Sequence, residues 1–245
     1  MSKRNSHAAK ALRRAERQGK QPATDISHAQ IAEAVHQAVC QATGTNGFRQ
    51  CIAYAVPGAA VASVITGQPH IMQAGGIEVL TGDVTGEGEA ALVLDPLSAD
   101  PEGGVENQEF HAWFSPEPVG LARGVVTSVR RDDLIIADLS MRHFSEYCAA
   151  AGAPWSREPL PAYCWASAHQ IGSELRVVYR PDPQTTMAVN KRASLEKELL
   201  EDITSLALHR LGVISTRKLD ELLHSPQPFA GSEWSTDNGV VFTRG

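Results

Sequence analysis

The spacing of apolar positions predicts an amphipathic helix near the start of the chain, over residues 25–40. Asp25 or Ser27 stands where a helix N-cap is expected, since both side chains accept hydrogen bonds from free backbone N–H groups. Apolar residues then recur at the interval that places them on one helical face: Ile31, Val35 and Val39.

A second helix is predicted to begin near Phe48, after the polar, Gly-containing segment 43–47. Pro57 lacks a backbone N–H and is followed by Gly58, so the pattern predicts that the helix stops or kinks there. The Ala-rich run 59–65 fits either a continuation of this helix or a buried strand, and its periodicity does not decide between them.

From about residue 70 the pattern changes to short apolar runs bounded by turn residues, which is typical of strands. The predicted strands are residues 77–80, 90–94, 110–114, 124–129, 133–138, 163–168 and 175–179. The predicted later helices are residues 143–151, 193–211 and 216–223, the second with a stripe of Leu195, Leu199, Ile203 and Leu206. Helices, then strands, then helices favour an α+β fold over alternating βαβ units.

Composition narrows the class of protein further. The chain has 245 residues, of which 42% are hydrophobic, so it is neither disordered nor fibrous. No run of residues is long and apolar enough to cross a membrane. We expect one domain over residues 25–245 and a flexible arm over residues 1–24.

Charge is unevenly distributed. Residues 1–20 carry seven Lys or Arg residues and one Glu, although the whole chain has a net charge of −6. An acidic body disfavours general nucleic-acid binding, because phosphate neutralisation drives that affinity. The basic arm leaves contact with an anionic surface as an alternative. The N-terminus lacks the apolar segment of a secretory signal, so we expect a cytoplasmic protein whose four cysteines are reduced: Cys40, Cys51, Cys148 and Cys164.

Cys51 is the first candidate for chemistry. It is expected in the first turn of the second helix, where unpaired N–H groups and the helix dipole favour thiolate over thiol. The thiolate is the nucleophilic form of cysteine, so this position suits a nucleophile. Taken alone, Cys51 fits a small buried apolar residue better than a nucleophile.

His111 is the second candidate, within the sequence Phe-His-Ala-Trp-Phe at 110–114. Side chains alternate along a strand, so His111 and Trp113 share one face. We expect that face to point at the helix that carries Cys51, with Trp113 shielding the imidazole. A histidine there can take the proton of the thiol and later protonate a leaving group.

Asp138 is the third candidate, because it ends the apolar run 134–137. A carboxylate at the end of a buried strand needs a partner, and an imidazole on a neighbouring strand would supply one. Such a carboxylate orients the histidine of a catalytic triad. Asp132 and Asp133 are alternative carboxylates that precede the strand.

A cysteine at a helix start, a His-Ala-Trp triplet in a strand and an aspartate at the end of a later apolar strand resemble the transglutaminase-like superfamily, a branch of the papain-like cysteine fold. The resemblance covers residues 40–145. It implies a papain-like α+β fold for residues 25–245, with a helix packed on an antiparallel sheet. It also implies that Cys51 is the nucleophile, His111 the base and Asp138 the group that orients it.

The implied reaction is thiol-dependent acyl transfer on an amide or ester, as in a peptidase, amidase, deamidase or transamidase. The substrate would be a peptide, a protein or a small amide or ester, and no cofactor or metal is implied. Candidate oxyanion donors are the backbone N–H of Cys51 and the side chains of Gln50 and Asn46, with Trp113 as a further substrate contact.

Two further alternatives stay open. His143, Cys148, Cys164 and His169 form two four-residue-spaced pairs that could bind zinc, although no Cys-x2-Cys knuckle is present. The fold could also serve as a non-catalytic module for protein interaction, with the helix over 193–211 as its contact surface.

Overall fold

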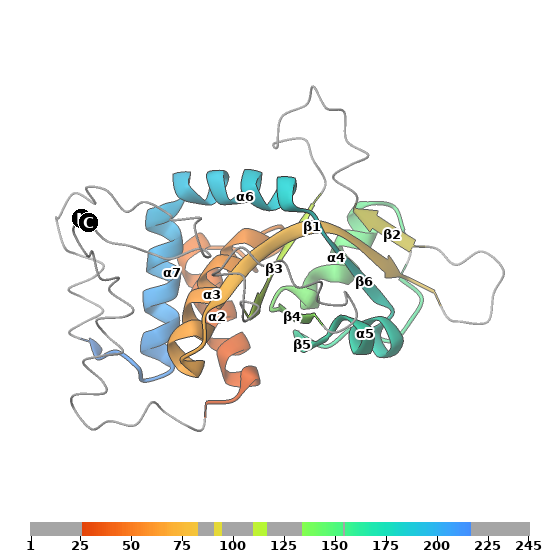
Figure 1. Cartoon of the computed structure of the whole chain (residues 1–245). Coiled ribbons are helices and arrows are strands. Elements are labelled where there is room, and N and C mark those ends of the chain that lie inside the picture. The colour runs from red at the N-terminus through yellow and green to blue at the C-terminus, as the bar shows by residue number, and fades with distance from the viewer. Residues whose placement is uncertain (1–25, 83–90, 95–109, 117–133, 154, 217–245) are drawn as a thin grey trace.

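The computed structural model describes residues 26–82, 91–94, 110–116, 134–153 and 155–216. These residues form an α+β fold. In Figure 1, the helices α2, α3 and α7 gather on one side of the molecule, and the sheet lies on the other side with α4 and α5. The predicted arm 1–24, the strand 124–129, and Asp132 and Asp133 lie outside the described residues, as does most of the predicted helix 216–223.

The first predicted helix is confirmed as α2 (His28–Thr43). Ser27 is its N-cap, and its side chain and that of Gln30 form a capping box with each other's backbone N–H. The helix ends at Gly44, whose φ of 66° is a left-handed conformation that suits glycine. Its apolar stripe is buried, as the spacing predicts.

The second helix, α3 (Cys51–Thr66), continues through Pro57 and Gly58 and includes the undecided Ala-rich run. The prediction of a stop there is wrong if read as an end of the helix. Proline inside a helix costs about 3 kcal/mol. Burial of α3 on nearly every side outweighs this cost, since eleven of its sixteen residues are buried. Gly58 lets Phe114 of the sheet pack directly against the helix backbone.

Within the described residues, six strands form one antiparallel sheet, with the order β2-β1-β3-β4-β5 and with β6 paired to β1. The strands are β1 (His70–Leu80), β2 (Ala91–Leu94), β3 (His111–Pro116), β4 (Ile135–Asp138), β5 (Cys164–Ser167) and β6 (Val177–Pro181). The long strand β1 arches across the molecule and pairs with β3 near one end and with β2 near the other (Figure 1).

The two faces of the sheet bury different clusters. On one face, Ala112, Phe114 and Ala137 pack with α2, α3 and α7. On the other face, Trp113 and Ile136 pack with residues that follow β4 and with β6. The second cluster includes Phe144 and Cys148 of the short helix α4 (Phe144–Ala150), which follows a 3-10 turn, η4 (Met141–His143).

After β5 the chain turns through α5 (Ala168–Gln170) and η5 (Ile171–Leu175) into β6. The helix predicted over 193–211 is confirmed as α7 (Lys197–Arg210), except at its start, where the first predicted residues end a separate helix, α6 (Pro183–Leu195). Leu195 ends α6 and is 83% exposed, so it does not belong to the buried stripe. The buried side of α7 carries Leu200, Ile203, Leu206 and Ala207. Among the described residues, no helix has the length and apolar character that crossing a membrane requires.

Candidate active site

The segment before α3 turns tightly and delivers Cys51 to the first position of the helix. Gly47 has a φ of 88° and Arg49 a φ of 61°, both left-handed. The backbone N–H of Gln50 donates to the carbonyl of Gly47 over 3.2 Å. A Cβ on residue 47 would collide with the Tyr54 hydroxyl, so glycine is needed there for space as well as for conformation. Cys51 therefore starts α3, as the sequence predicts.

The thiol of Cys51 is buried, with 8% of the residue exposed. Burial raises the pKa of the thiol to about 11, and the negative charge of Asp138 acts in the same direction. Hydrogen bonding from the backbone N–H groups of Ala112 and Ile52 lowers the pKa but does not compensate. The prediction that the helix start favours the thiolate is thus wrong for the resting protein, because desolvation exceeds the dipole effect.

The prediction that the face of β3 with His111 and Trp113 points at the helix carrying Cys51 is also wrong. The side chains that face α3 are Ala112 and Phe114, whereas Trp113 belongs to the cluster on the opposite face. His111 is on the side of Trp113, and its ring meets Phe144 edge-on, with ring centroids 5.1 Å apart. The thiol lies at the beginning of β3, where the backbone of Ala112 follows His111.

His111 and Asp138 form a buried pair, each 1% exposed. The distance from His111 Nε2 to Asp138 Oδ2 is 2.7 Å. The register explains this contact: β3 pairs with β4 at Phe114 and Ala137, so Asp138 lies beside Trp113 on the face that also carries His111. Within the described part of the chain, no hydrogen bond joins His111 to the Cys51 thiol.

Asp138 has three further hydrogen-bond donors. Ser140 donates to Oδ1 through both its backbone N–H and its hydroxyl, each over 2.8 Å. The Tyr179 hydroxyl donates to Oδ2 over 2.7 Å. Burial alone would raise the pKa of the carboxyl group, but His111, Tyr179 and Ser140 outweigh it, so the pKa is lowered. Asp138 is therefore a carboxylate at neutral pH, despite its burial.

Aromatic side chains surround the imidazole. Trp113 is fully buried, and its ring packs edge-on against Tyr179 with centroids 5.0 Å apart. The prediction that Trp113 contacts substrate is therefore wrong for this conformation, because Trp113 is a core residue. Tyr147 is half-buried, and the centroid of its ring is 4.8 Å from that of Phe48. Its pKa is raised mainly by burial and, to a smaller extent, by the nearby Cys51.

The oxyanion candidates differ in their local roles. The side-chain oxygen of Asn46 accepts a hydrogen bond from the backbone N–H of Phe48 over 3.0 Å, so it shapes the turn. Asn46 is exposed. Gln50 is half-buried and precedes the first helical residue, and its side chain makes no capping hydrogen bond to α3. Gln50 is thus better placed than Asn46 to supply a donor near the thiol.

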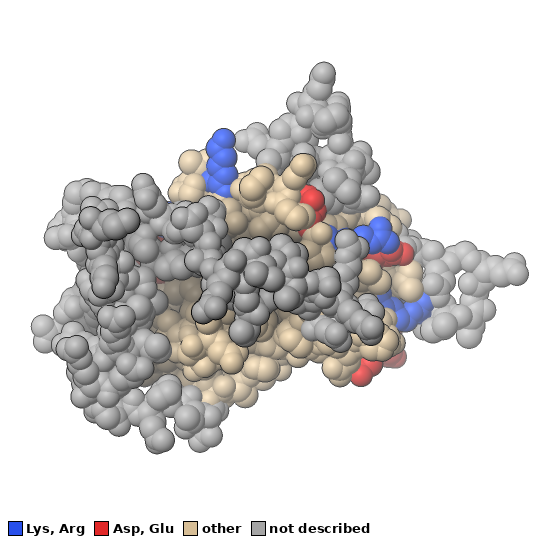
Figure 2. All heavy atoms as spheres, in the orientation of Figure 1, with Lys and Arg blue, Asp and Glu red and all other residues tan. Residues whose placement is uncertain are grey.

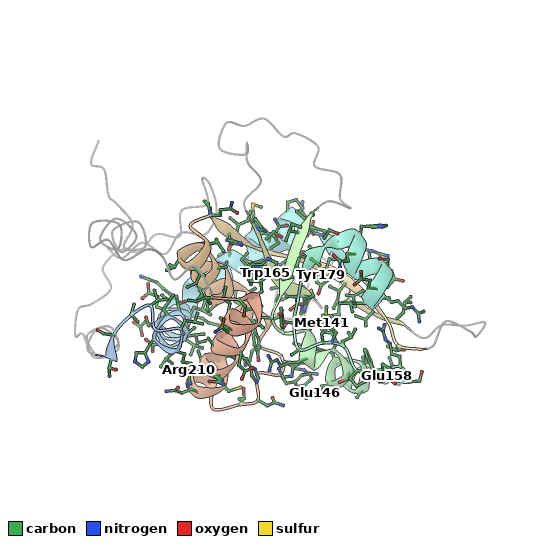
Figure 3. All side chains as sticks on the ribbon, turned by 90° about the horizontal axis from the view of Figure 1, so that it is seen from below. Met141, Glu146, Glu158, Trp165, Tyr179 and Arg210 are labelled. Atoms are coloured by element: carbon green, nitrogen blue, oxygen red, sulfur yellow. The ribbon has the colours of Figure 1, made fainter. Side chains whose placement is uncertain are left out.

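The sequence did not point to Tyr147 or Tyr179 at this site. Ser140 follows Asp138 by two residues, a spacing typical of a turn capped by aspartate, and its two hydrogen bonds to Asp138 are of that kind. Tyr179 reaches Asp138 from a strand 41 positions later, and nothing local predicts that contact. In Figure 3, Tyr179 and Met141 lie among the strands. Glu146 lies near the edge of the molecule, and Arg210 lies at α7, away from the sheet.

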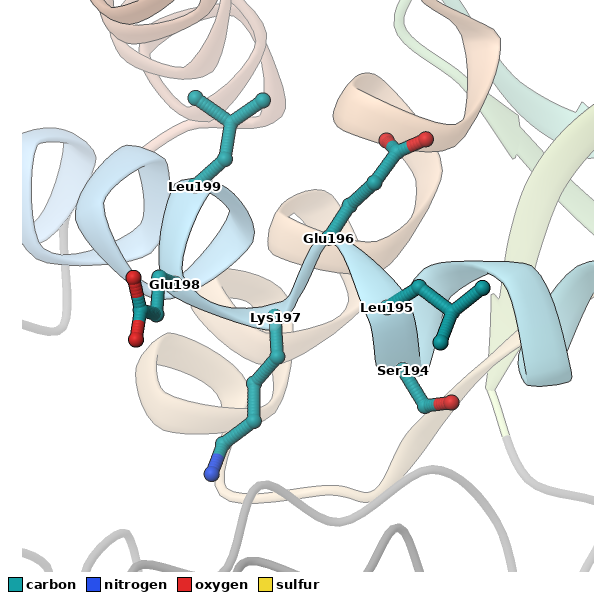
Figure 4. A pocket seen from close by; sticks show the side chains of 6 residues that line it. All are labelled: Ser194, Leu195, Glu196, Lys197, Glu198 and Leu199. Atoms are coloured by element: carbon teal, nitrogen blue, oxygen red, sulfur yellow. The ribbon is translucent and has the colours of Figure 1, made fainter. Parts of the chain in front are cut away.

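The four residues of the zinc alternative do not come together. The His143 ring faces Glu146 and the hydroxyl of Tyr54, and His169 is exposed. Among the residues that the structure describes, no cluster of three or more His, Cys, Asp or Glu residues can hold a metal ion. A hollow at the junction of α6 and α7 is lined by residues 194–199, which are remote in sequence from the candidate site and on other elements (Figure 4).

Comparison with known proteins adds little. No protein-family model and no curated protein matches the sequence. Among solved structures, the chain is similar to one described as the crystal structure of genomics APC5867, with a TM-score of 0.42 and 14% sequence identity. The similarity covers 90% of this chain and 93% of the other. A TM-score of this size is too low to establish a shared fold.

Proposed function

We propose that this protein catalyses thiol-dependent acyl transfer on an amide or ester, and that its α+β fold is of the papain-like, transglutaminase-like type. The observation that carries the proposal is the fully buried His111–Asp138 pair, 2.7 Å apart, beside the strand position at which the Cys51 thiol meets the Ala112 backbone. Burial of a carboxylate costs desolvation free energy, which its four hydrogen bonds must offset. One known function of such a buried carboxylate is to orient a catalytic histidine.

In the proposed reaction, His111 uses Nδ1, because Nε2 is engaged with Asp138. Nδ1 takes the proton of the Cys51 thiol as the sulfur attacks the carbonyl carbon of the substrate. The carbonyl oxygen gains the negative charge, which the backbone N–H of Cys51 and the side chain of Gln50 stabilise. The imidazolium then gives its proton to the departing amine or alcohol, and a thioester on Cys51 remains.

The second half of the reaction reverses these proton transfers. A water molecule, or an amine in a transamidase, gives a proton to His111 and attacks the thioester carbonyl. The C–S bond breaks, and the thiolate of Cys51 recovers its proton from the imidazolium. Asp138 stays ionised throughout and holds the imidazole through Nε2, since its pKa is held low by its donors.

The high pKa of the thiol assigns a specific task to His111. At neutral pH a thiol with a pKa of about 11 is almost entirely protonated. The histidine must therefore remove the proton during the attack or form an ion pair with the thiolate once substrate is near. The acidic chain, with a net charge of −6, favours a neutral or basic peptide among possible substrates. The residues of this site require no cofactor.

An activated ester tests this proposal without knowledge of the natural substrate. We expect p-nitrophenyl acetate to produce a burst of p-nitrophenolate and to leave an acetyl group on Cys51, located by peptide mass spectrometry. Cys51→Ala should abolish both signals. Cys148→Ala is the matched control, because burial raises the pKa of the Cys148 thiol to about 11 as well, and this variant should keep both. A burst that survives Cys51→Ala would exclude the mechanism.

A second candidate function is a non-catalytic interaction module. Exposed apolar side chains on α6 favour it, since Met187 is 65% and Leu195 is 83% exposed. This candidate predicts no acetylation of Cys51. Nucleic-acid binding through the basic arm concerns residues outside the described part of the chain. On the face shown in Figure 2, Lys and Arg side chains are interspersed with Asp and Glu.

A further inference from the structure

We propose that Tyr179 is a positioning residue of this site, which acts through Asp138 to set the orientation and basicity of His111. The inference rests on the proposed function, because it gives the His111–Asp138 pair a third member. Tyr179 comes from β6, which lies next to β1, whereas His111 and Asp138 come from β3 and β4. Three different strands therefore meet at one carboxylate.

The hydrogen bonds of Asp138 are divided between its two oxygens. Oδ1 accepts both hydrogen bonds from Ser140, and Oδ2 accepts from His111 and from the Tyr179 hydroxyl, each over 2.7 Å. Tyr179 and the imidazole thus share one oxygen. A hydrogen bond from Tyr179 withdraws negative charge from the same atom that pairs with the imidazole, and it prevents the carboxylate from turning about its axis.

Tyr179 is itself held in place. It is 7% exposed, and its ring packs edge-on against Trp113. Its hydroxyl oxygen lies 3.7 Å from the sulfur of Cys164. The single hydroxyl hydrogen is directed at Asp138, so the thiol of Cys164 is the donor in the second contact. The chain of donors therefore runs from Cys164 to Tyr179 to Asp138.

Removal of the tyrosine hydroxyl has a defined electrostatic consequence. The charge on Oδ2 then faces His111 alone, which strengthens the hydrogen bond from Nε2 and stabilises the imidazolium that forms during the reaction. An imidazolium that is held more strongly returns its proton to a leaving group more slowly. The other titratable groups close enough to interact with Asp138 are Tyr54, His143, Tyr147, Cys51 and Cys164. None of them hydrogen-bonds to Oδ2 within the described residues.

The experiment compares the wild-type protein with Tyr179→Phe, which keeps the ring and removes only the hydroxyl. The hydrogen bond from His111 Nε2 to Asp138 is followed by NMR of the ring N–H proton, with the signal assigned by His111→Gln. We expect this proton signal to move downfield in Tyr179→Phe, because Oδ2 then has one donor fewer and the bond from His111 strengthens. Acetylation of Cys51 by p-nitrophenyl acetate should slow by roughly tenfold, far less than loss of the carboxylate would cause.

Two comparisons separate this role from simple destabilisation. Tyr54→Phe removes another buried tyrosine hydroxyl, one that does not hydrogen-bond to Asp138, so it should leave the His111 ring N–H signal unchanged. In an Asp138→Asn background, Tyr179→Phe should have no further effect on the rate, because the residue acts through the carboxylate.

The outcomes of the experiment are distinct for the two proposals. An unchanged ring N–H signal of His111 and an unchanged acetylation rate in Tyr179→Phe would overturn the role of Tyr179 and leave the proposed function intact. An additive loss of rate in the Asp138→Asn background would also overturn the role of Tyr179. A wild-type protein that is never acetylated on Cys51 would instead overturn the proposed function, whatever the NMR signal shows.

Discussion

Two networks of histidine and tyrosine lie among the described residues, one buried within the sheet and one half-buried between helices, and their composition differs. One joins His111, Asp138 and Tyr179 within the sheet. In the other, the Tyr54 hydroxyl lies 2.6 Å from His36 Nδ1 and 3.2 Å from His143 Nε2, between α2, α3 and η4. The first surrounds a carboxylate that is 1% exposed. The second meets its carboxylate, Glu146, at the surface, where that side chain is 45% exposed.

The difference lies in where charge is allowed. In the helical network, burial lowers the pKa of both His36 and His143, so neutral rings and one hydroxyl suffice to join the elements. In the sheet network, four hydrogen bonds keep Asp138 ionised in the interior. Hydrogen bonds between secondary-structure elements do not require a buried charge, because the helical network connects α2, α3 and η4 through neutral rings and one hydroxyl group. This comparison favours a catalytic reason for Asp138.

The largest expected effect is on catalysis. Asp138→Asn keeps the size of the side chain but removes the charge and presents a donor to one of its partners. We expect the rate of Cys51 acetylation to fall by about 10⁴-fold, on the precedent of the serine-protease triad. Stopped-flow release of p-nitrophenolate measures it. A loss below tenfold would contradict the orienting role of Asp138 and would make Asp132 or Asp133 the candidate for it.

The next effect is on stability and compares the two carboxylates directly. Asp138→Ala leaves His111, Tyr179 and Ser140 without their acceptor in the interior, and we expect it to lower the free energy of unfolding by about 3–5 kcal/mol. Glu146→Ala should lower it by about 1 kcal/mol or less, because that pair is exposed to solvent. Urea denaturation gives both values. Equal losses would mean that the buried pair has no special place in the fold.

A smaller loss is expected from the helical network. Tyr54→Phe leaves the two histidine rings without their shared partner and should lower the free energy of unfolding by about 1–3 kcal/mol, again from urea denaturation. The ring N–H signal of His111 should not move. A change in that signal would show that the two networks are coupled through α3 and would contradict their independence.

The smallest effect is a pH dependence of stability. The pKa values of His36 and His143 lie below their ordinary value of 6.5 in the folded protein, so unfolding takes up protons as the pH falls. Their contribution is therefore complete above pH 6.5 and is lost as the pH falls below it. Asp138, whose pKa is lowered from 3.8, adds its loss only below that value. Melting temperatures between pH 7.5 and 5 should fall less in a His36→Gln, His143→Gln variant.

Local patterns in the sequence predicted much of the fold, and the errors have physical causes. The positions of most strands along the chain were predictable because each short apolar run ends at turn residues, whereas their order in the sheet was not predicted. The continuation of α3 through Pro57 and the break at Glu196 depend on tertiary burial, which periodicity does not report. The same limit applies to β3: alternation separates His111 from Ala112, but it does not say which side faces a helix.

In the candidate site, too, the features set by local sequence were predictable and those set by tertiary packing were not. Cys51, His111 and Asp138 were each suggested by a local setting, and the pairing of the last two followed from adjacent apolar strands. The raised pKa of the thiol was missed, because the helix dipole is visible in a sequence and burial is not. Tyr179 was missed because its contact with Asp138 depends on how the sheet folds around its second cluster.

The most direct test of whether His111 activates the Cys51 thiol is the pH dependence of Cys51 alkylation by iodoacetamide. It is measured on the Cys51 peptide in the wild-type protein and in His111→Ala. We expect the wild-type thiol to react at neutral pH, because His111 takes its proton as the sulfur attacks. Without that base, the variant should react only at more alkaline pH, where the thiol ionises by itself, since burial raises the pKa of this thiol to about 11. Two superimposable profiles, both rising near that high pH, would contradict a role for His111 in activating the sulfur.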